Sequence, residues 1–243
     1  MAQEDKRPFF SWSKDQHEVW SLLYARQHSN ALARSTAMFR EGLDIFHIDG
    51  ERIPDFERID QIMQASTGWT LVSTPVQFSD GQDWFERLWE RRMLITEYIR
   101  SKDDLDYTPL PDIWHDAYGH LPFLASQRYC NLIHAFSRII LDCPKDVRRG
   151  LGSIWWHTIE FGLLKEGGKV RALGTGLMSS FGELQYAYSG AVEHRPFDPT
   201  DIALYKPSPH AFHERLWVLE SFEQLEEFVA TWEPSKLPEV YPA

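Results

Sequence analysis

The stretch PDIWHDAYGHLPF, Pro111–Phe123, contains two histidines, His115 and His120, that stand five positions apart. On a regular α-helix this spacing turns the two side chains about 140° away from each other. Both imidazoles reach one metal ion only where the helix begins, ends or is distorted. Prolines on both sides of the pair and Gly119 within it favour a distortion, because proline lacks a backbone donor and glycine is conformationally permissive.

A zinc hydrolase is one alternative for this histidine pair. In the zinc-protease motif the histidines stand four apart on one helical face, with a catalytic glutamate between them. The present pair has a different spacing and no glutamate in that position, so the sequence disfavours zinc hydrolysis. Two ordinary polar histidines are the other alternative, because a chain with ten histidines in 243 residues contains such pairs by chance.

Glu160, in WWHTIEFGLLKEGG, is the candidate for a third ligand. Iron oxygenases hold their metal with two neutral imidazoles and one carboxylate on a single face of an octahedron. Glu160 lies in an otherwise apolar stretch with Ile159, Phe161 and Leu163, and burying an unpaired carboxylate is costly. It therefore needs a cation, and the residues alone leave open whether that cation is a metal ion or an arginine.

The whole chain, residues 1–243, is predicted to form one mainly α domain with a few short β-strands. No alternation of strands and helices is visible, so a doubly wound sheet is disfavoured. Strands are expected at Thr70–Val76, at a sheet edge because of Pro75, and at 215–220. Ser79-Asp80 is expected to cap a long helix, Trp84–Arg100, which the prolines of the next loop terminate. Further helices are expected at 17–40 in two parts, from about 59 to 68, and near 126–142, 146–166, 178–190 and 222–232.

Composition narrows the classes of partner. The formal net charge is −11 and no run of lysine or arginine forms a basic stripe, so nucleic acids and anionic membranes are excluded as partners. Two cysteines, Cys130 and Cys143, are too few for a disulfide framework. No signal peptide or membrane span is recognisable, so a cytoplasmic location is expected. Ten tryptophans and fifteen phenylalanines suit either an aromatic core or a pocket for a flat substrate.

Two long segments resemble the signature blocks of the tetrahydropterin-dependent aromatic amino acid hydroxylases, the family of the phenylalanine, tyrosine and tryptophan hydroxylases. They are YTPLPDIWHDAYGHLPF and WWHTIEFGLLKEGGKVRALGTGLMSSFGELQY. IPDFERIDQIMQASTGW and SFEQLEEFVATW are similar to flanking segments of the same catalytic domain. The resemblance covers about residues 17 to 232. It implies the family's catalytic fold, without the regulatory domain or tetramer-forming tail of some members, as in bacterial members. A monomer or small homo-oligomer is therefore expected.

The resemblance also assigns site residues. His115, His120 and Glu160 match the family's iron ligands. Arg100 matches the arginine that pairs with the substrate carboxylate, a role that suits the bidentate guanidinium, although a solvated cation at a helix C-terminus is the alternative. The remaining matches to the amino-acid pocket are Thr108 and Pro109 beside the substrate backbone, Trp156 and Phe161 as aromatic walls, and Ser179 near the carboxylate and the first histidine.

The pterin side departs from the family pattern. Trp84 replaces a stacking phenylalanine, Asp116 replaces a glutamate that faces the pterin, and Trp155 replaces a tyrosine near the iron. The loop Gln77–Gln82 lacks the usual serine-rich pattern. The resemblance therefore implies cofactor binding at these positions, and it leaves the pterin binding mode and the hydroxylated ring position open.

The implied activity is an Fe(II)- and tetrahydropterin-dependent monooxygenation, with O2 as co-substrate, of the ring of an aromatic amino acid. Phenylalanine is the expected substrate. The alternatives are tryptophan, an unusual ring position in a biosynthetic pathway, and a metal-retaining binding protein that has lost turnover.

Overall fold

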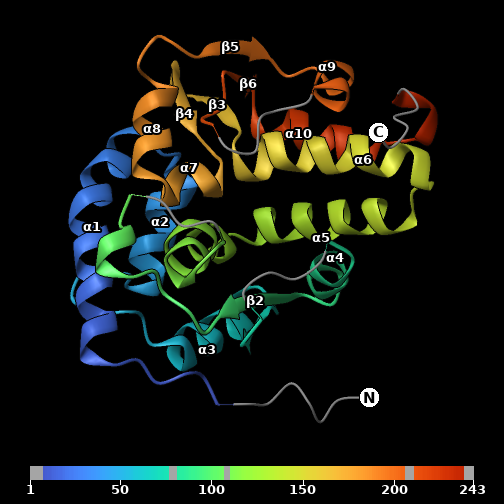
Figure 1. The fold of residues 1–243 in the computed structure, drawn as a ribbon. Helices are drawn as coiled ribbons and strands as arrows, with labels where there is room; N and C mark the ends of the chain where they lie inside the picture. Colours follow the sequence, from blue (N-terminus) through green and yellow to red (C-terminus); the bar gives the residue numbers. More distant parts are fainter. Residues whose placement is uncertain (1–7, 77–80, 107–109, 206–210, 238–243) are drawn as a thin grey trace.

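Helices dominate the structure, a computed structural model that describes residues 8–76, 81–106, 110–205 and 211–237. The predicted class, mainly α with a few short strands, is confirmed (Figure 1). Among the described residues, no helix combines the length and the apolar composition of a membrane span. The predicted cap Ser79-Asp80 lies outside the described residues.

The first helical region has the two parts that its periodicity predicts. α1, Lys14–Arg34, begins with a capping box, in which the Ser13 side chain accepts from the amide of Gln16 and the Gln16 side chain accepts from the amide of Ser13. Extended backbone at Ser35 and Thr36 ends it, and α2, Ala37–Phe46, follows. α3, Phe56–Ser66, is capped by Asp55 and ends close to the predicted position.

The predicted long helix Trp84–Arg100 is wrong. α4, Gly81–Trp89, ends near Arg91, which adopts a left-handed conformation with φ 59°, and the chain continues as strand β2, Arg92–Thr96. Successive residues from Met93 to Ile95 are buried, as expected of a strand covered on both faces. β2 pairs in parallel with β1, Thr70–Thr74. The structure therefore contains one β–α–β unit that sequence reasoning missed, although its sheet has two strands and is not doubly wound.

Two central helices connect the histidine motif to the segment that contains Glu160. α5, Gln127–Asp142, is capped by Ser126 and agrees with the prediction. α6, Lys145–Trp155, is shorter than the predicted helix 146–166, because the chain changes to a π-helix, Trp156–Glu160, and then to strand β3, Leu163–Glu166. The turn between them requires a glycine, since a Cβ on Gly162 would lie 2.3 Å from the Thr158 carbonyl oxygen.

The C-terminal half forms a four-stranded sheet in the order β4-β3-β6-β5. The predicted helix 178–190 is broken at Ser180, whose side chain caps α8 by accepting from the Glu183 amide. The predicted strand at 215–220 and the predicted helix at 222–232 are confirmed as β6 and α10. The elements of this half are β4, Lys169–Ala172; α7, Thr175–Ser179; α8, Phe181–Ala187; β5, Glu193–Pro196; α9, Pro199–Leu204; β6, Arg215–Leu219; and α10, Phe222–Ala230.

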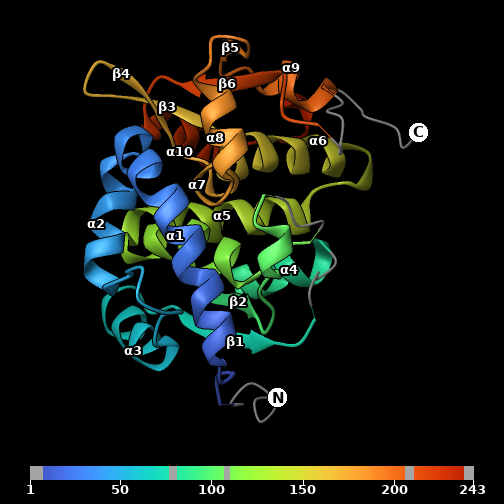
Figure 2. The same ribbon diagram turned by 60° about the vertical axis from the view of Figure 1, so that its left-hand side comes forward.

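The two β-sheets lie at opposite ends of the molecule, with helices between them. The four-stranded sheet with α8 and α9 lies at one end, the β1–β2 pair with α3 and α4 lies at the other, and α5 and α6 lie between them (Figures 1 and 2). One connected cluster of buried apolar side chains extends from Val19 to Leu237. The described elements therefore share one apolar core.

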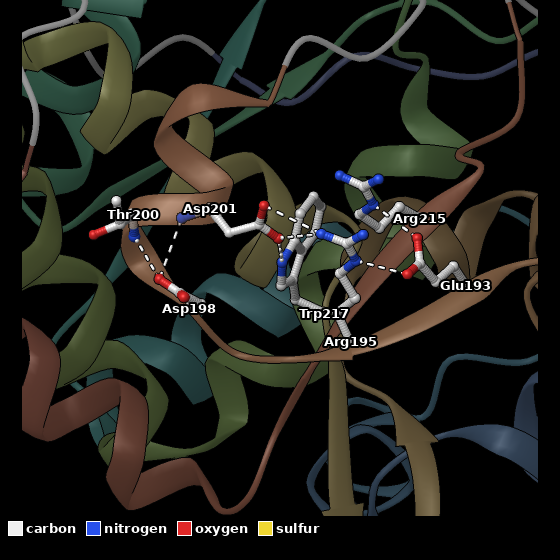
Figure 3. Close-up of polar contacts among 7 residues, drawn as sticks. All are labelled: Glu193, Arg195, Asp198, Thr200, Asp201, Arg215 and Trp217. Carbon is white, nitrogen blue, oxygen red and sulfur yellow. Dashed lines mark hydrogen bonds and ion pairs between the residues drawn. The ribbon is translucent and has the colours of Figure 1, made fainter.

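A polar network fixes the outer edge of the four-stranded sheet (Figure 3). The Asp201 carboxylate accepts from Arg195, at 3.1 Å, and from the indole N–H of Trp217, at 3.0 Å. Glu193 accepts from the other side of the Arg195 guanidinium at 2.8 Å. The network holds the Trp217 ring in place, and that ring packs against His157 with 4.6 Å between centroids.

Candidate active site

The two motif histidines lie in a π-helix, His115–His120. The amide of Leu121 donates to the Asp116 carbonyl, and hydrogen bonds between residues five apart define this wider helix. Five-residue spacing therefore places the two imidazoles side by side, with 3.0 Å between their Nε2 atoms. The distortion expected from the sequence is confirmed. The π-helix brings the His115 and His120 side chains together.

Glu160 ends the second π-helix, Trp156–Glu160, in which the Phe161 amide donates to the Trp156 carbonyl at 2.9 Å. Its carboxylate oxygens lie 3.7 Å from Nε2 of His115 and 3.5 Å from Nε2 of His120. Within the described residues these three side chains are the one group arranged to hold a metal ion. The groups that contact Glu160 there are the histidines and the Thr175 hydroxyl, which donates at 2.6 Å, rather than an arginine.

Hydrogen bonding and burial prepare both histidines as neutral ligands. The Ser179 hydroxyl donates to the Gly176 carbonyl and lies 2.8 Å from Nδ1 of His115, so it accepts the Nδ1 proton and leaves the Nε2 lone pair directed at the metal position. Burial, and secondarily the neighbouring His120, lowers the pKa of His115 to about 4. Burial lowers the pKa of His120 to about 3. Neutral imidazole is the form that binds a metal ion.

The ligand separations fit a single transition-metal ion. With metal–ligand bonds of about 2.1 Å, ligands at 90° to 109° stand about 3.0 to 3.4 Å apart. The observed separations between the ligand atoms of His115, His120 and Glu160 are 3.0, 3.5 and 3.7 Å. Two imidazoles and one carboxylate are the ligand set of the facial triad, which keeps positions open for other ligands. The separations alone suit zinc as well as iron.

Arg100 is buried rather than solvated, so the alternative of a free cation at a helix end is wrong. Its Nε and Nη2 donate to the two carboxylate oxygens of Asp112 at 2.8 and 2.9 Å, and both side chains are almost fully covered. Asp112 also accepts from the His115 amide at 3.2 Å. Sequence reasoning missed Asp112, although an acid three positions before a ligating histidine was a visible signal.

The expected aromatic walls lie next to each other. The rings of Trp156 and Phe161 are 4.8 Å apart at 44°. A Cβ on Gly176 would lie 2.6 Å from the Phe161 ring, so α7 packs on this wall only with a glycine there. The Trp156 indole N–H donates to Nε2 of His213 at 2.9 Å, a contact that sequence reasoning missed. Thr108 and Pro109 lie outside the described residues.

The pterin-side candidates lie beside the metal ligands. The ring centroids of Trp84 and His120 lie 5.7 Å apart. Both side chains line a small apolar cavity together with Trp155. The Tyr129 hydroxyl, another group that sequence reasoning missed, is buried without a hydrogen-bond partner in the described residues, and Tyr129 lines the same cavity.

Asp116 is turned toward strand β2. Its carboxylate accepts from the Thr96 amide at 2.8 Å. Burial raises the pKa of Asp116 to about 8, against the lowering effect of that hydrogen bond.

Comparison with known proteins identifies this arrangement. The family model described as biopterin-dependent aromatic amino acid hydroxylase matches residues 2–239. A phenylalanine-4-hydroxylase of Chromobacterium violaceum is 32% identical over 221 residues, covering 90% of this chain and 74% of the relative.

Solved structures share the fold at similar identity. The phenylalanine hydroxylase of Legionella pneumophila superposes with a TM-score of 0.88 at 28% identity, covering 93% of this chain and 89% of that chain. A structure of the Chromobacterium violaceum enzyme with bound iron(III) and 7,8-dihydrobiopterin superposes with a TM-score of 0.84 at 30% identity, covering 90% of this chain and 81% of that one. This chain belongs to the biopterin-dependent aromatic amino acid hydroxylase family, and it is an iron- and pterin-dependent monooxygenase.

Proposed function

We propose that this enzyme hydroxylates the ring of phenylalanine, with Fe(II) held by His115, His120 and Glu160. The observation that carries the proposal is the cluster of two neutral imidazoles and one carboxylate, in which Glu160 shares a π-helix with Trp156 and precedes Phe161 of the Trp156–Phe161 wall. The name of the Chromobacterium violaceum relative supports phenylalanine over other aromatic amino acids.

Fe(II) held by His115, His120 and Glu160, together with a tetrahydropterin, would supply the activation of O2, with one oxygen atom passing to the substrate ring and the other to the pterin. The protein orients the substrate and excludes water. Ser179 holds the first histidine in one tautomer, and Thr175 donates to the carboxylate of Glu160. These contacts keep the ligand atoms aimed at one point before any metal binds.

Arg100 is proposed to bind the substrate carboxylate. Asp112 engages the Nε and Nη2 edge of the guanidinium, which fixes the plane of the fork and directs the Nη1 side away from Asp112. A fixed guanidinium recognises a carboxylate bidentately, with little further ordering to do. Thr108 and Pro109 stay proposed neighbours of the substrate backbone, and Trp156 and Phe161 are proposed to enclose its ring.

Trp84, Trp155 and Asp116 are proposed to form the pterin side of the site. An indole in place of a phenyl ring keeps a π-face for stacking. The position of Trp84 and Trp155 next to His120 supports this assignment. The enzyme is proposed to act in the cytoplasm as a monomer or small homo-oligomer. Its two cysteines are free and buried, as suits a reducing compartment.

A turnover assay read by mass spectrometry tests the proposal. Fe(II)-loaded enzyme is given phenylalanine, tyrosine or tryptophan in air, each with and without a tetrahydropterin. A pterin-dependent gain of one oxygen atom by phenylalanine is expected, and chromatography against standards gives the ring position. A gain by tryptophan alone would overturn the substrate assignment. Bound iron with no oxygen consumption under any combination would mean a binding protein without turnover.

A further inference from the structure

The Trp156 wall of the amino-acid pocket is weakly packed. The Trp156 side chain is 43% exposed, so core packing does not fix its orientation. Its indole N–H donates to Nε2 of His213 at 2.9 Å. The imidazole of His213 also lies against the second wall, with 4.2 Å between its centroid and that of Phe161 at a tilt of 33°. One buried side chain therefore contacts both walls.

Glu183 holds His213 in the tautomer that this arrangement requires. Its Oε1 lies 2.5 Å from Nδ1 of His213 and accepts from the backbone amide of the same residue at 2.9 Å. A carboxylate accepts but does not donate, so Nδ1 carries the proton and Nε2 keeps the lone pair that accepts from Trp156. Both Glu183 and His213 are more than nine-tenths buried. The anchoring pair is thus buried and hydrogen-bonded, although the Trp156 wall that it contacts is exposed.

A neighbouring histidine does not compete for these contacts. His157 faces His213 edge-on, with 5.4 Å between centroids at 90°. Both ring nitrogens of His157 lack a hydrogen-bond partner in the described part of the chain. The two nitrogens of His213 are therefore committed to Glu183 and Trp156.

We propose that His213, oriented by Glu183, is a positioning residue that sets the angle of the aromatic walls and thereby the place of the substrate ring. The inference rests on the proposed binding of an aromatic amino acid between Trp156 and Phe161. Glu183 and Ser179 lie on the consecutive helices α8 and α7. One helical corner thus orients both a metal ligand, through Ser179, and the substrate wall, through Glu183.

Two substitutions separate the hydrogen bond from the bulk of the imidazole. In His213→Asn the amide nitrogen replaces Nδ1, so the bond to Glu183 is kept and the acceptor for Trp156 is lost. In His213→Gln the amide oxygen reaches the place of Nε2, so the acceptor for Trp156 is kept. Both substitutions lose the ring that contacts Phe161. The two variants are therefore reciprocal: His213→Asn keeps the side-chain bond to Glu183 and loses the acceptor for Trp156, and His213→Gln keeps that acceptor and loses the bond to Glu183.

The first readout is substrate affinity and coupling in the iron-loaded enzyme. His213→Asn is expected to raise the Kd for phenylalanine about three- to tenfold, the effect of one lost hydrogen bond. It is also expected to lower the amount of product formed per tetrahydropterin oxidised, because a substrate ring that is displaced from its position between the walls is hydroxylated less often. His213→Gln is expected to stay within about twofold of wild type. In a Trp156→Phe background, which lacks the indole N–H, the extra loss of phenylalanine affinity in His213→Asn relative to His213→Gln is expected to disappear.

The second readout needs no turnover. The indole N–H resonance of Trp156, assigned by its loss in Trp156→Phe, is recorded by NMR in protein loaded with diamagnetic Zn(II). It is expected to move upfield in His213→Asn and to hold its position in His213→Gln. An unmoved resonance, or an equal loss of affinity in both variants, would overturn the proposal. Wild-type enzyme that leaves phenylalanine unchanged would instead refute the proposed function, and the NMR result would still decide the role of His213.

Discussion

Replacing His157 with phenylalanine is expected to stabilise the protein, and increasingly so as the pH falls. His157 is 1% exposed, and its ring lies among Trp217, Tyr205 and His213 at centroid distances of 4.6, 5.4 and 5.4 Å. Both ring nitrogens are without a partner in the described residues. A phenyl ring has a similar flat shape and removes both unsatisfied groups. An unpaired buried polar group costs about 1–3 kcal/mol, which sets the expected gain at pH 7.

The pH dependence follows from the depressed pKa of His157. Burial, and secondarily the electrostatic effect of the neighbouring His213, lowers the pKa of His157 from 6.5 to about 3. The unfolded chain therefore binds a proton below pH 6.5 that the folded chain does not bind until about pH 3. Stability is lost as the pH falls through this window. Between pH 7 and pH 5 the loss amounts to about 2 kcal/mol from this one residue. His157→Phe removes it.

Urea denaturation of metal-free protein at pH 7 and pH 5 measures both effects. Chelator in the buffer keeps His115 and His120 in the same state in every protein, so the difference between wild type and variant isolates His157. The matched control is His47→Asn, at an exposed left-handed position that asparagine tolerates, and it is expected to change neither value. An advantage of His157→Phe that is equal at the two pH values would refute the reasoning, because the residue would then not resist protonation in the fold.

Three further substitutions test separate parts of the site. Glu160→Ala is expected to lower bound iron at least tenfold and to abolish hydroxylation in a soluble protein; full iron content by metal analysis would contradict its role as a ligand. Arg100→Lys keeps the charge but loses the fork held by Asp112, so the KM for the amino acid is expected to rise tenfold or more; an unchanged KM in steady-state kinetics would remove Arg100 from substrate binding. Gly176→Ala forces a Cβ against the Phe161 ring, so a loss of about 1–3 kcal/mol in urea denaturation and weaker substrate binding are expected; a loss of iron instead would show that the strain passes to the metal ligands.

The residues of the metal centre could be named from the sequence, but the family resemblance, rather than their spacing alone, selected them over ordinary polar side chains. The spacing of His115 and His120 excluded a regular helix, and the structure provides the π-helix that this exclusion requires. Glu160 stood out as an acid among apolar residues, and the structure places it beside both histidines.

Two kinds of structural feature could not be predicted from the sequence. The end of α4 depends on a left-handed Arg91, where no glycine marks the change, and the run Arg92–Thr96 continued the helical pattern that precedes it. The contact between Glu183 and His213 joins residues 30 positions apart and exists only because α8 folds against the segment before β6. Neither depends on local periodicity, which is what a single sequence displays.

The π-helices make the site sensitive to chain length in a way that point substitutions do not reveal. A five-residue hydrogen-bonded turn holds one residue more than an α-helical turn. Deleting a single residue between His115 and His120 would let the segment relax to the more favourable α-helix and place the histidines four apart, with the chain beyond them rotated. Each ligand-bearing turn thus contains one residue more than an α-helical turn would. Contacts with the rest of the fold stabilise this less favourable π-helical form. A one-residue deletion or insertion in either turn is therefore expected to disrupt the metal site more than a substitution of a neighbouring side chain.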